Sequence, residues 1–484
     1  MKIFINAFIA IGFLLCGSEC MAQNIPTTVI NARIFGIKGD GSDETSKFRN
    51  AINALATRGG GTLYIPKGIY YVSAISQSAG IIVGPNTRIK GDGINQTILK
   101  RINNDVKFSR IIVIKDASNV SVEDITIDGN KDNQDQSFEQ QHNIFCQRAA
   151  NLKFNNVEYK NTVGDGLYFS IGSRNVIISN CIFNNITRVG INCTNLDSAL
   201  ITGCNFENII TNGIKIEKNQ VLTSSPSRNI LVTESFFSAK NLQNGAAGIN
   251  INGLSGDLVD NFKIVKNKFK KIDFCVTGLR YVDDVLVEDN IADSVKSLCR
   301  SLSYSLGVGF GSGSITVQNN KISSGLGDRK TDNMVFAFYY FKNVLVKDNT
   351  FVESKYSPYS LIIVCIEDQN IEFVNNSIIS SGTVRAIVLN KCNNINFNAN
   401  YFKINSSKNV IEITDDPNIH LKSLNVVNNT FDGNYKNILS DPNASLQKAT
   451  STSPVINYFN NKKLNNAATN VLNVPAQMLR LQKR

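Results

Sequence analysis

The sequence lacks the long alanine, leucine and glutamate stretches from which a mainly helical protein is built. Asparagine, isoleucine, valine, phenylalanine and glycine are abundant instead, and this balance favours an extended β architecture. After the first residues, no apolar segment is long enough to cross a membrane, so we expect no membrane insertion. These absences argue against helical bundles and helical membrane proteins and favour a protein built from strands.

The first residues, MKIFINAFIAIGFLLCGSECMAQ, are typical of a secretory signal that is cleaved after Ala22. Lys2 provides a short basic start, and the apolar run over residues 3–15 is too short to span a bilayer. Cys16 and Cys20 lack the preceding leucine and small-residue spacing of a lipoprotein signal, so we do not expect a lipid anchor. Residues 1–22 are therefore predicted to be a signal peptide of a secreted or periplasmic protein.

The chain is basic, with a formal net charge of +11. Removal of residues 1–22 would take away Lys2 and Glu19 and leave this charge unchanged. A basic protein outside the cell favours anionic partners, and we expect an acidic polysaccharide. The aromatic residues show no stacking motif with regularly spaced basic neighbours, so we expect no nucleic acid partner. We also expect the protein to be a monomer. The alternative is that the excess lysine serves solubility alone.

One segment recurs in twelve copies, from NVSVEDITI (119–127) to SLNVVNNTF (423–431). Apolar residues alternate within each copy, as in a strand with one buried face, and each copy predicts one coil of a right-handed parallel β-helix. Equivalent positions of successive coils stack about 4.8 Å apart in such a fold. A column of asparagines at the seventh position can therefore hydrogen-bond along the axis. The seventh positions are Ile125, Val157, Cys181, Cys204, Ser235, Asn267, Asn290, Asn320, Asn349, Asn376, Asn400 and Asn429.

Beyond residue 22, the cysteines are scattered singly along the chain. Their spacing matches neither a small disulfide framework nor a CxxC metal site. Stacked parallel side chains are poorly aimed for a disulfide, so we expect mostly free, buried thiols that act as small apolar fillers. These cysteines are Cys146, Cys181, Cys193, Cys204, Cys275, Cys299, Cys365 and Cys392.

An amphipathic helix is expected over residues 43–57, with acidic residues in its first turn and the glycines at 59–61 after its end. It would cover the first coil, which otherwise exposes a row of unpaired strand groups. The fold class is therefore all-β: a single-stranded right-handed parallel β-helix over residues 23–440, with an N-terminal cap helix. Residues 441–484 are expected to form a C-terminal cap or a partly flexible tail. The apolar face of the cap helix consists of Phe48, Ala51, Ile52 and Leu55.

The stretch FGIKGDGSDETSKFRNAINALATRGGGTLYIPKGIYYV (35–72), followed by IKGDGINQTIL (89–99), resembles the opening of the pectate lyase superfamily. That superfamily includes polygalacturonase-like and epimerase-like members. The resemblance implies a secreted right-handed β-helix that cleaves or modifies polysaccharides, often acidic ones. The coils through residue 431 fit the same fold, so the resemblance covers most of the chain beyond the signal.

Individual activities within that superfamily have motifs of their own. DITIDGNKDNQ (124–134) is similar to a segment of mannuronan epimerases, which then carry a YGFDPH-like motif. This chain reads DGLYFS at 165–170 instead, without the family's Asp and His, which argues against epimerase activity. The NTD, DD, HG and RIK motifs of polygalacturonases are also missing, apart from Asn161-Thr162 and a lone Asp165.

Alignment of the strands that precede each turn places side chains in outward columns. His142 and Asp165 fall in one column, one coil apart, where they could hydrogen-bond to each other, with Arg110 beneath them and Arg188 beside them. A carboxylate that orients an imidazole, with cations and a tyrosine nearby, could serve as general base and charge stabiliser. The alternative is that Asp165 is an ordinary turn residue between two glycines and His142 a surface loop residue. The predicted catalytic residues are His142, Asp165, Tyr168 and Arg188, and the predicted substrate-binding residues are Arg110, Phe145, Lys215 and Glu217.

Two mechanisms compete for this column. In β-elimination, cations neutralise the substrate uronate while His142 or Tyr168 removes the C5 proton. Glycoside hydrolysis instead needs two carboxyl groups roughly 5 to 9.5 Å apart, and Asp165 and Glu217 are too far apart in the register. Unless Glu158 or an acidic residue of 128–139 folds over the site, hydrolysis has no partner carboxylate.

We therefore expect a lyase that acts by β-elimination on a uronate-containing glycan. The alternatives are a polygalacturonase-like glycoside hydrolase and a non-catalytic glycan-binding or adhesin β-helix. No cofactor is expected. A Ca²⁺ site has little support because no three carboxylates share one column.

Overall fold

The structure is a computed structural model in which the chain forms two compact units, residues 1–182 and residues 183–484, each considered by itself below. The predicted signal at 1–22 lies outside the described residues, as does most of 441–484. The structure describes residues 25–74, 79–217, 226–239, 246–301, 311–324, 334–353, 361–380, 385–405, 409–414, 421–440, 455–464, 472–473 and 479–480.

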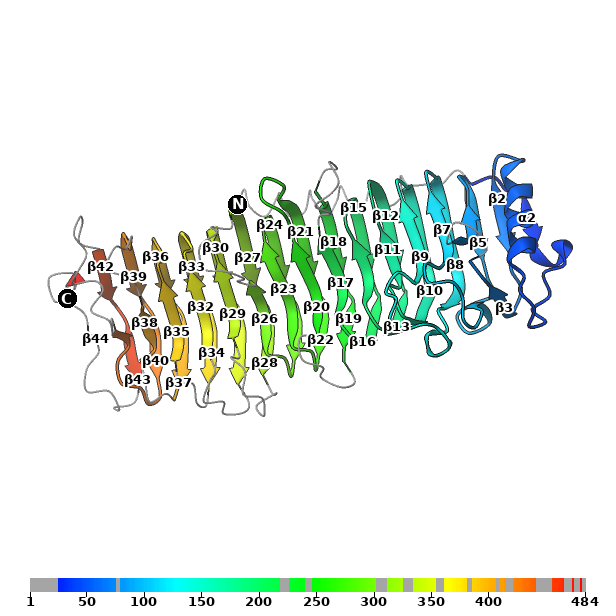
Figure 1. The fold of residues 1–484 in the computed structure, drawn as a ribbon. Helices are drawn as coiled ribbons and strands as arrows, with labels where there is room; N and C mark the ends of the chain where they lie inside the picture. The colour runs from blue at the N-terminus through cyan, green and yellow to red at the C-terminus, as the bar shows by residue number, and fades with distance from the viewer. Residues whose placement is uncertain are drawn as a thin grey trace. The chain divides into compact units, whose positions relative to one another are not determined.

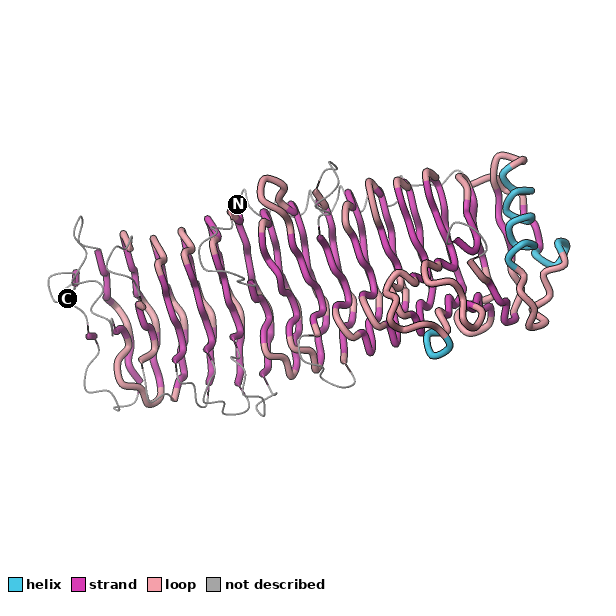
Figure 2. Tube along the Cα trace, in the orientation of Figure 1, coloured by secondary structure: helices cyan, strands magenta, loops and turns pink. Residues whose placement is uncertain are grey.

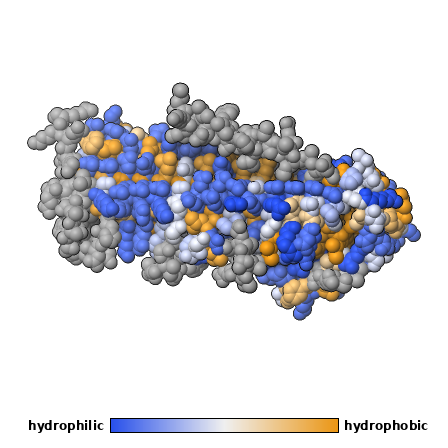
Figure 3. All heavy atoms as spheres, turned by 90° about the horizontal axis from the view of Figure 1, so that it is seen from above, coloured by the Kyte–Doolittle hydropathy of each residue, from blue (hydrophilic) through white to orange (hydrophobic). Residues whose placement is uncertain are grey.

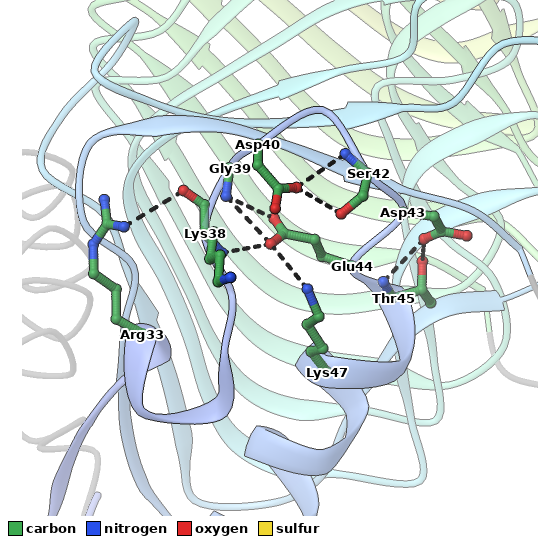
Figure 4. A network of polar contacts seen from close by, with 9 residues as sticks. All are labelled: Arg33, Lys38, Gly39, Asp40, Ser42, Asp43, Glu44, Thr45 and Lys47. Carbon is green, nitrogen blue, oxygen red and sulfur yellow. Dashed lines mark hydrogen bonds and ion pairs between the residues drawn. The ribbon is translucent and has the colours of Figure 1, made fainter.

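The N-terminal cap of the first unit is the predicted helix. Helix α2 (Thr45–Ala56) lies beside the strand β2 (Gly61–Tyr64) (Figures 1 and 2) and buries the four apolar side chains expected on its inner face. Its first turn contains no acidic residue, which differs from the prediction. Glu44 precedes the helix because its carboxylate accepts backbone N–H groups from Lys38, at 2.5 Å, and from Gly39 (Figure 4). The carboxylate of Asp43 instead accepts the backbone N–H of Thr45, the first helical residue, at 3.0 Å (Figure 4).

The first unit is a right-handed parallel β-helix whose strands belong to two sheets. Each strand pairs in parallel with the equivalent strand of the next coil, for example Ile112 with Ile144 and Ile144 with Leu167, all three of which are buried. One sheet contains β4 (Ala79–Val83), β7 (Arg110–Lys115), β9 (His142–Gln147) and β11 (Leu167–Phe169). The other elements are β1 (Val29–Asn31), η1 (Ala32–Phe35), β2, β3 (Gly68–Val72), β5 (Thr87–Lys90), β6 (Thr97–Arg101), β8 (Ser118–Asp128), η2 (Lys131–Asn133), β10 (Ala150–Thr162) and β12 (Ser173–Ser179).

The second unit repeats the same parallel pairing. One sheet contains β14 (Val189–Cys193), β17 (Asn212–Glu217), β20 (Ala247–Asn252), β23 (Phe274–Arg280), β26 (Ser297–Ser301), β29 (Met334–Tyr339), β32 (Leu361–Ile366), β35 (Arg385–Asn390), β38 (Ile411–Ile413), β41 (Leu439–Ser440) and β44 (Leu472–Asn473). The remaining strands are β13 (Ile182–Ile186), which begins at the unit boundary, β15 (Leu196–Thr202), β16 (Asn205–Ile209), β18 (Arg228–Thr233), β19 (Phe236–Ser238), β21 (Val259–Val265), β22 (Lys268–Lys270), β24 (Val282–Glu288), β25 (Ile291–Asp293), β27 (Ser312–Gln318), β28 (Lys321–Ser324), β30 (Phe341–Lys347), β31 (Thr350–Glu353), β33 (Asn370–Val374), β34 (Ser377–Ser380), β36 (Ile395–Asn398), β37 (Tyr401–Ile404), β39 (Ser423–Val427), β40 (Thr430–Asp432), β42 (Val455–Phe459), β43 (Lys462–Leu464) and β45 (Leu479–Arg480).

The predicted asparagine column is confirmed in the second unit. Asn349, for example, donates its amide to Val317 O at 2.8 Å and to Asn376 Oδ1 at 3.0 Å. Its backbone N–H also donates to Asn376 Oδ1, at 3.0 Å. The same pattern joins Asn267, Asn290, Asn320, Asn349, Asn376, Asn400, Asn429 and Asn461, and we call this set the buried asparagine ladder.

A second asparagine ladder, which the sequence analysis missed, lies at another corner. In the first unit, Asn119 bonds to Asn86 at 2.9 Å, Asn151 to Asn119 at 3.0 Å and Asn175 to Asn151 at 3.1 Å. All four have a φ angle between 54° and 58°, and asparagine is a residue that tolerates this left-handed conformation. Hydrophilic residues gather in rows on the face of the molecule shown in Figure 3. Asparagine thus both shapes the turns and links successive coils.

The eight cysteines beyond residue 22 are all free and buried, as predicted. Burial raises the pKa of the Cys275, Cys299 and Cys365 thiols. A thiol that resists ionisation is a poor nucleophile, so these residues serve as packing groups. Aromatic side chains fill the core beside them, as in the stacked rings of Phe206 and Phe237, whose centroids are 4.5 Å apart.

Candidate functional site

The first unit brings the central predicted residues together on one side of β7, β9 and β11. Arg110 pairs in register with His142, and Phe145 pairs with Tyr168, as the column alignment predicted. Arg110, Phe145 and Tyr168 are partly exposed, so this part of the first unit faces solvent.

His142 and Asp165 are in direct contact. His142 Nδ1 lies 3.4 Å from Asp165 Oδ2 and accepts the backbone N–H of Asp165 at 3.0 Å. The other ring nitrogen, Nε2, lies 3.3 Å from Gln140 Oε1. This network assigns the proton of a neutral imidazole to Nε2, because Nδ1 already accepts a hydrogen bond.

Both side chains are completely buried, at 0% exposure, and here the sequence analysis was wrong. It predicted an outward column open to solvent. The segment 131–141 covers the pair: Gln140 lies on the imidazole, and Gln141 O accepts Gly164 N–H at 2.9 Å and the Thr162 hydroxyl at 2.8 Å. A polysaccharide on this surface would therefore not touch His142 or Asp165 directly.

An aromatic surface lies over the buried pair. The Tyr168 ring meets the rings of His142 and Phe145 edge-on, at centroid distances of 5.0 and 5.4 Å. The Arg110 guanidinium lies 4.8 Å from the centroid of Phe145, which is within the range of a cation–π interaction. Burial lowers the pKa of Arg110, and the interaction with Tyr168 opposes this effect. We call Arg110, Phe145 and Tyr168 the aromatic patch.

The corner at Asn143 explains why His142 faces the patch. Strict strand alternation would place His142 on the same inner side as Ile144. Asn143 instead turns inward and donates its amide to Ile127 O at 3.0 Å and to Lys160 O at 3.3 Å. The backbone therefore changes direction between His142 and Ile144, and the imidazole stays with the outer rings.

Arg101 supports the pair from inside, and the sequence analysis missed it. Its side chain is 0% exposed and donates to Gln141 Oε1 at 3.1 Å, Ser109 O at 3.3 Å and His142 O at 2.8 Å. Burial lowers its pKa to about 10. Among the described residues it forms no ion pair and its Nε has no hydrogen-bond partner, so amide and carbonyl oxygens satisfy only the two terminal nitrogens of this cation. The period of two in TILKR, where Thr97 and Leu99 are also buried, could have indicated its inward direction.

The remaining predicted residues belong to the second unit. Lys215 Nζ and Glu217 Oε2 form an ion pair of 2.6 Å, and both side chains are partly exposed. Arg188, which was expected beside His142, accepts the Thr211 hydroxyl at its carbonyl oxygen. The site described here is therefore built from first-unit residues alone, without Arg188, Lys215 and Glu217.

Within the described residues, the structure gathers no group of three or more His, Cys, Asp or Glu side chains that could hold a metal ion. The same residues include no helix with the length and apolarity needed to cross a membrane.

Family models cover the first part of the chain. Residues 29–109 match the family described as rhamnogalacturonase A/epimerase, pectate lyase-like, and residues 110–291 match the right handed beta helix region.

Two curated relatives come from Azotobacter vinelandii. Mannuronan C5-epimerase AlgE1 is 37% identical over 112 residues, which make up 22% of this chain and 8% of that protein. Alginate lyase 7 is 37% identical over 110 residues, or 21% of this chain and 13% of that protein. The chain thus spans only a small fraction of the length of the curated relatives that it matches.

Solved structures resemble the chain at low identity. The surface adhesin PfbA of Streptococcus pneumoniae is 15% identical, covers 86% of this chain and 93% of its own, and gives a TM-score of 0.54. The A-module of mannuronan C-5 epimerase AlgE6 from A. vinelandii is 18% identical, covers 80% of this chain and 99% of its own, and gives a TM-score of 0.46. The similarity to PfbA shows the shared fold alone.

Proposed function

Because the chain belongs to the pectate lyase superfamily of right-handed parallel β-helix proteins, we propose that it is an enzyme that modifies an acidic, uronate-containing polysaccharide outside the cytoplasm. The family matches and the curated relatives, whose names refer to mannuronan and alginate, support the acidic substrate class. The formal net charge of +11 agrees with an anionic substrate. The activity within this class is β-elimination.

The aromatic patch above the His142–Asp165 pair is the observation that supports this reaction best. Tyr168 is the titratable group of this site that solvent reaches, whereas the imidazole and the carboxylate beneath it are sealed. Arg110 lies beside it and can pair with a substrate carboxylate, because a guanidinium matches a carboxylate in shape and charge. An acid–base group and a carboxylate-binding cation thus share one exposed surface.

β-elimination at this patch assigns a role to each group. Arg110 neutralises the uronate carboxylate, which makes the C5 proton more acidic, and Tyr168, as its phenolate, takes that proton. The C5 electron pair forms the C4=C5 double bond, the C4–O bond breaks with its pair on the leaving oxygen, and the Tyr168 hydroxyl gives the proton to that oxygen, which restores the phenolate. The His142 ring supports Tyr168 from below, Asp165 contacts His142 in turn, and neither of the two buried groups contacts the substrate.

Hydrolysis is less well supported because the nearby carboxylates have structural roles. Glu158 accepts the Thr126 hydroxyl and pairs with Lys160, both at 3.0 Å. Asp135 accepts the backbone N–H of Ser137 at 3.0 Å. Asp165 is sealed, so it cannot serve as one of the two carboxyl groups that hydrolysis requires.

A screen of purified protein against polygalacturonate, mannuronan and guluronan tests the proposal. New ultraviolet absorbance together with new reducing ends indicates β-elimination. Reducing ends alone would show hydrolysis, inversion at C5 seen by NMR without chain cleavage would show epimerisation, and binding without any of these changes would show an adhesin. Arg110→Met should abolish turnover, and Lys115→Met is its charge-matched control, because Lys115 is an exposed cation on the same strand.

A further inference from the structure

In the second unit, a threonine hydroxyl without a partner lies in a column of outward polar side chains. Lys215, Asn250, Thr277 and Arg300 pair in register across β17, β20, β23 and β26. Thr277 is only 3% exposed, and its buried Oγ1 has no hydrogen-bond partner among the described residues. Buried polar groups are almost always satisfied, so this hydroxyl needs an explanation.

The neighbouring Arg300 has unused hydrogen-bonding capacity as well. Its guanidinium carbon lies 5.1 Å from the centroid of Phe274, and no described residue forms a hydrogen bond with its buried Nε. Among the described residues Arg300 forms no ion pair, although its side chain is partly exposed. A cation that rests on an aromatic ring without a carboxylate is available to an anionic ligand.

The backbone is irregular at this point. The pairing of β20 with β23 shifts between Ile251 and Asn252, and Gly278 has a φ angle of +85°. A Cβ at Gly278 would lie 2.6 Å from Asn250 Oδ1 and 2.8 Å from Asn252 Oδ1, so only glycine leaves room for both amides. Bulges of this kind often re-aim side chains next to binding sites. Here the bulge places two amides next to the Thr277 and Arg300 column.

We propose that Thr277, Arg300 and Asn250 form a binding subsite for one uronate residue of an acidic glycan. The Arg300 guanidinium would pair with the sugar carboxylate, and the Asn250 amide would bond to a sugar hydroxyl group. The bound sugar would displace the side chains that cover the buried Thr277 hydroxyl and bond to it as well. Phe274 offers an apolar surface beside these three residues, against which the apolar face of a sugar ring can pack. The ligand class rests on the proposed function, but the subsite requires no catalysis and lies entirely within the second unit.

Binding of short oligosaccharides tests the subsite. The probes are trigalacturonate, trimannuronate and triguluronate, with maltotriose as an uncharged control, and calorimetry or protein NMR measures the affinity. Arg300→Met should weaken binding of the preferred trimer by about tenfold or more, and Thr277→Val by about tenfold, since each removes a hydrogen-bonding group worth about one such factor. Thr277→Ser should restore affinity, and Lys321→Met, a loss of an exposed cation elsewhere in the unit, should leave it unchanged.

Thr277→Val also tests how the unsatisfied hydroxyl affects the stability of the protein. Its unfolding temperature should equal or exceed that of the wild type, because it removes a buried hydroxyl that has no partner. If Arg300→Met and Thr277→Val bind every trimer as the wild type does, or if no trimer binds, the subsite does not exist. Turnover of a polymer by the same preparation would show that this failure leaves the proposed function standing. Trimer binding that depends on Arg300, without turnover of any polymer, would support the subsite and contradict the proposed enzymatic activity.

Discussion

The two units fill the same turn position with different side chains. In the first unit Ile125, Val157 and Cys181 occupy it, all at 0% exposure. In the second unit Cys204 and Ser235 occupy it first, and the buried asparagine ladder, from Asn267 to Asn461, occupies it in the later coils. Each ladder amide must meet the oxygen of the next coil, so the ladder requires the same turn geometry in every coil. Apolar side chains at this position can pack without the same turn geometry in every coil.

This difference indicates where a repetitive fold can hold reactive or ligand-binding side chains. The first unit carries the covering segment 131–141 and concentrates its buried polar groups at another corner, around Arg101, His142 and Asp165. In the second unit the candidate subsite lies at the bulge beside Gly278, away from the ladder. Regular positions stabilise the fold, and irregular positions hold the groups available for a ligand.

Tyr168→Phe should have the largest effect, because it removes the acid–base oxygen and keeps the ring. Turnover should fall by about 10²- to 10⁴-fold, the usual contribution of a positioned acid or base. The unfolding temperature should change little, since Phe fills the same volume. Rates of ultraviolet absorbance on the preferred polymer measure the effect. Tyr71→Phe, another partly exposed tyrosine of the first unit, is the matched control and should retain full turnover.

His142→Ala should lower both stability and turnover, which separates it from Tyr168→Phe. The change removes the fully buried acceptor of the Asp165 backbone N–H, and loss of one partner of a buried hydrogen bond costs about 1 to 3 kcal/mol. Urea unfolding measures this loss. A stability equal to the wild type would mean that the pair is open to water, contrary to the burial described here.

Asn349→Ala should destabilise the second unit by about 3 kcal/mol, because it removes one rung of the ladder and leaves buried carbonyl groups unsatisfied. Turnover by the folded protein should be unchanged. Asn370→Ala is the matched control: its amide bonds to Asn343 at 3.0 Å in an exposed row, so its loss should cost less than about 1 kcal/mol. Equal losses for the two variants would remove the distinction between buried and exposed ladders.

Asp368→Asn should give the smallest effect and one that depends on pH. Burial raises the pKa of Asp368 well above 3.8, and its Oδ2 has no hydrogen-bond partner. As the pH rises above 3.8, the unfolded chain releases this proton before the folded one does, so the carboxyl lowers stability increasingly. The variant should therefore be more stable than the wild type near neutral pH, and the difference should vanish below pH 3.8. A difference independent of pH in urea unfolding would contradict this assignment.

Alternation and the asparagine column in the sequence predicted the fold, the cap helix and the register that pairs Arg110 with His142 and Phe145 with Tyr168. These features follow from local patterns with a fixed period. The burial of His142 and Asp165 could not be predicted, because it depends on the path of 131–141, which belongs to no repeat. Arg101 was missed because a buried cation without a carboxylate partner has no sequence signature beyond its position in an alternating strand.

The most direct test of the account is the ultraviolet absorbance of polygalacturonate, mannuronan and guluronan incubated with the wild-type protein and with Tyr168→Phe. The account predicts that the wild type produces absorbing, unsaturated ends from one of these polymers and that the variant loses this activity while it remains folded. A variant as active as the wild type, or new reducing ends without absorbance, would contradict it.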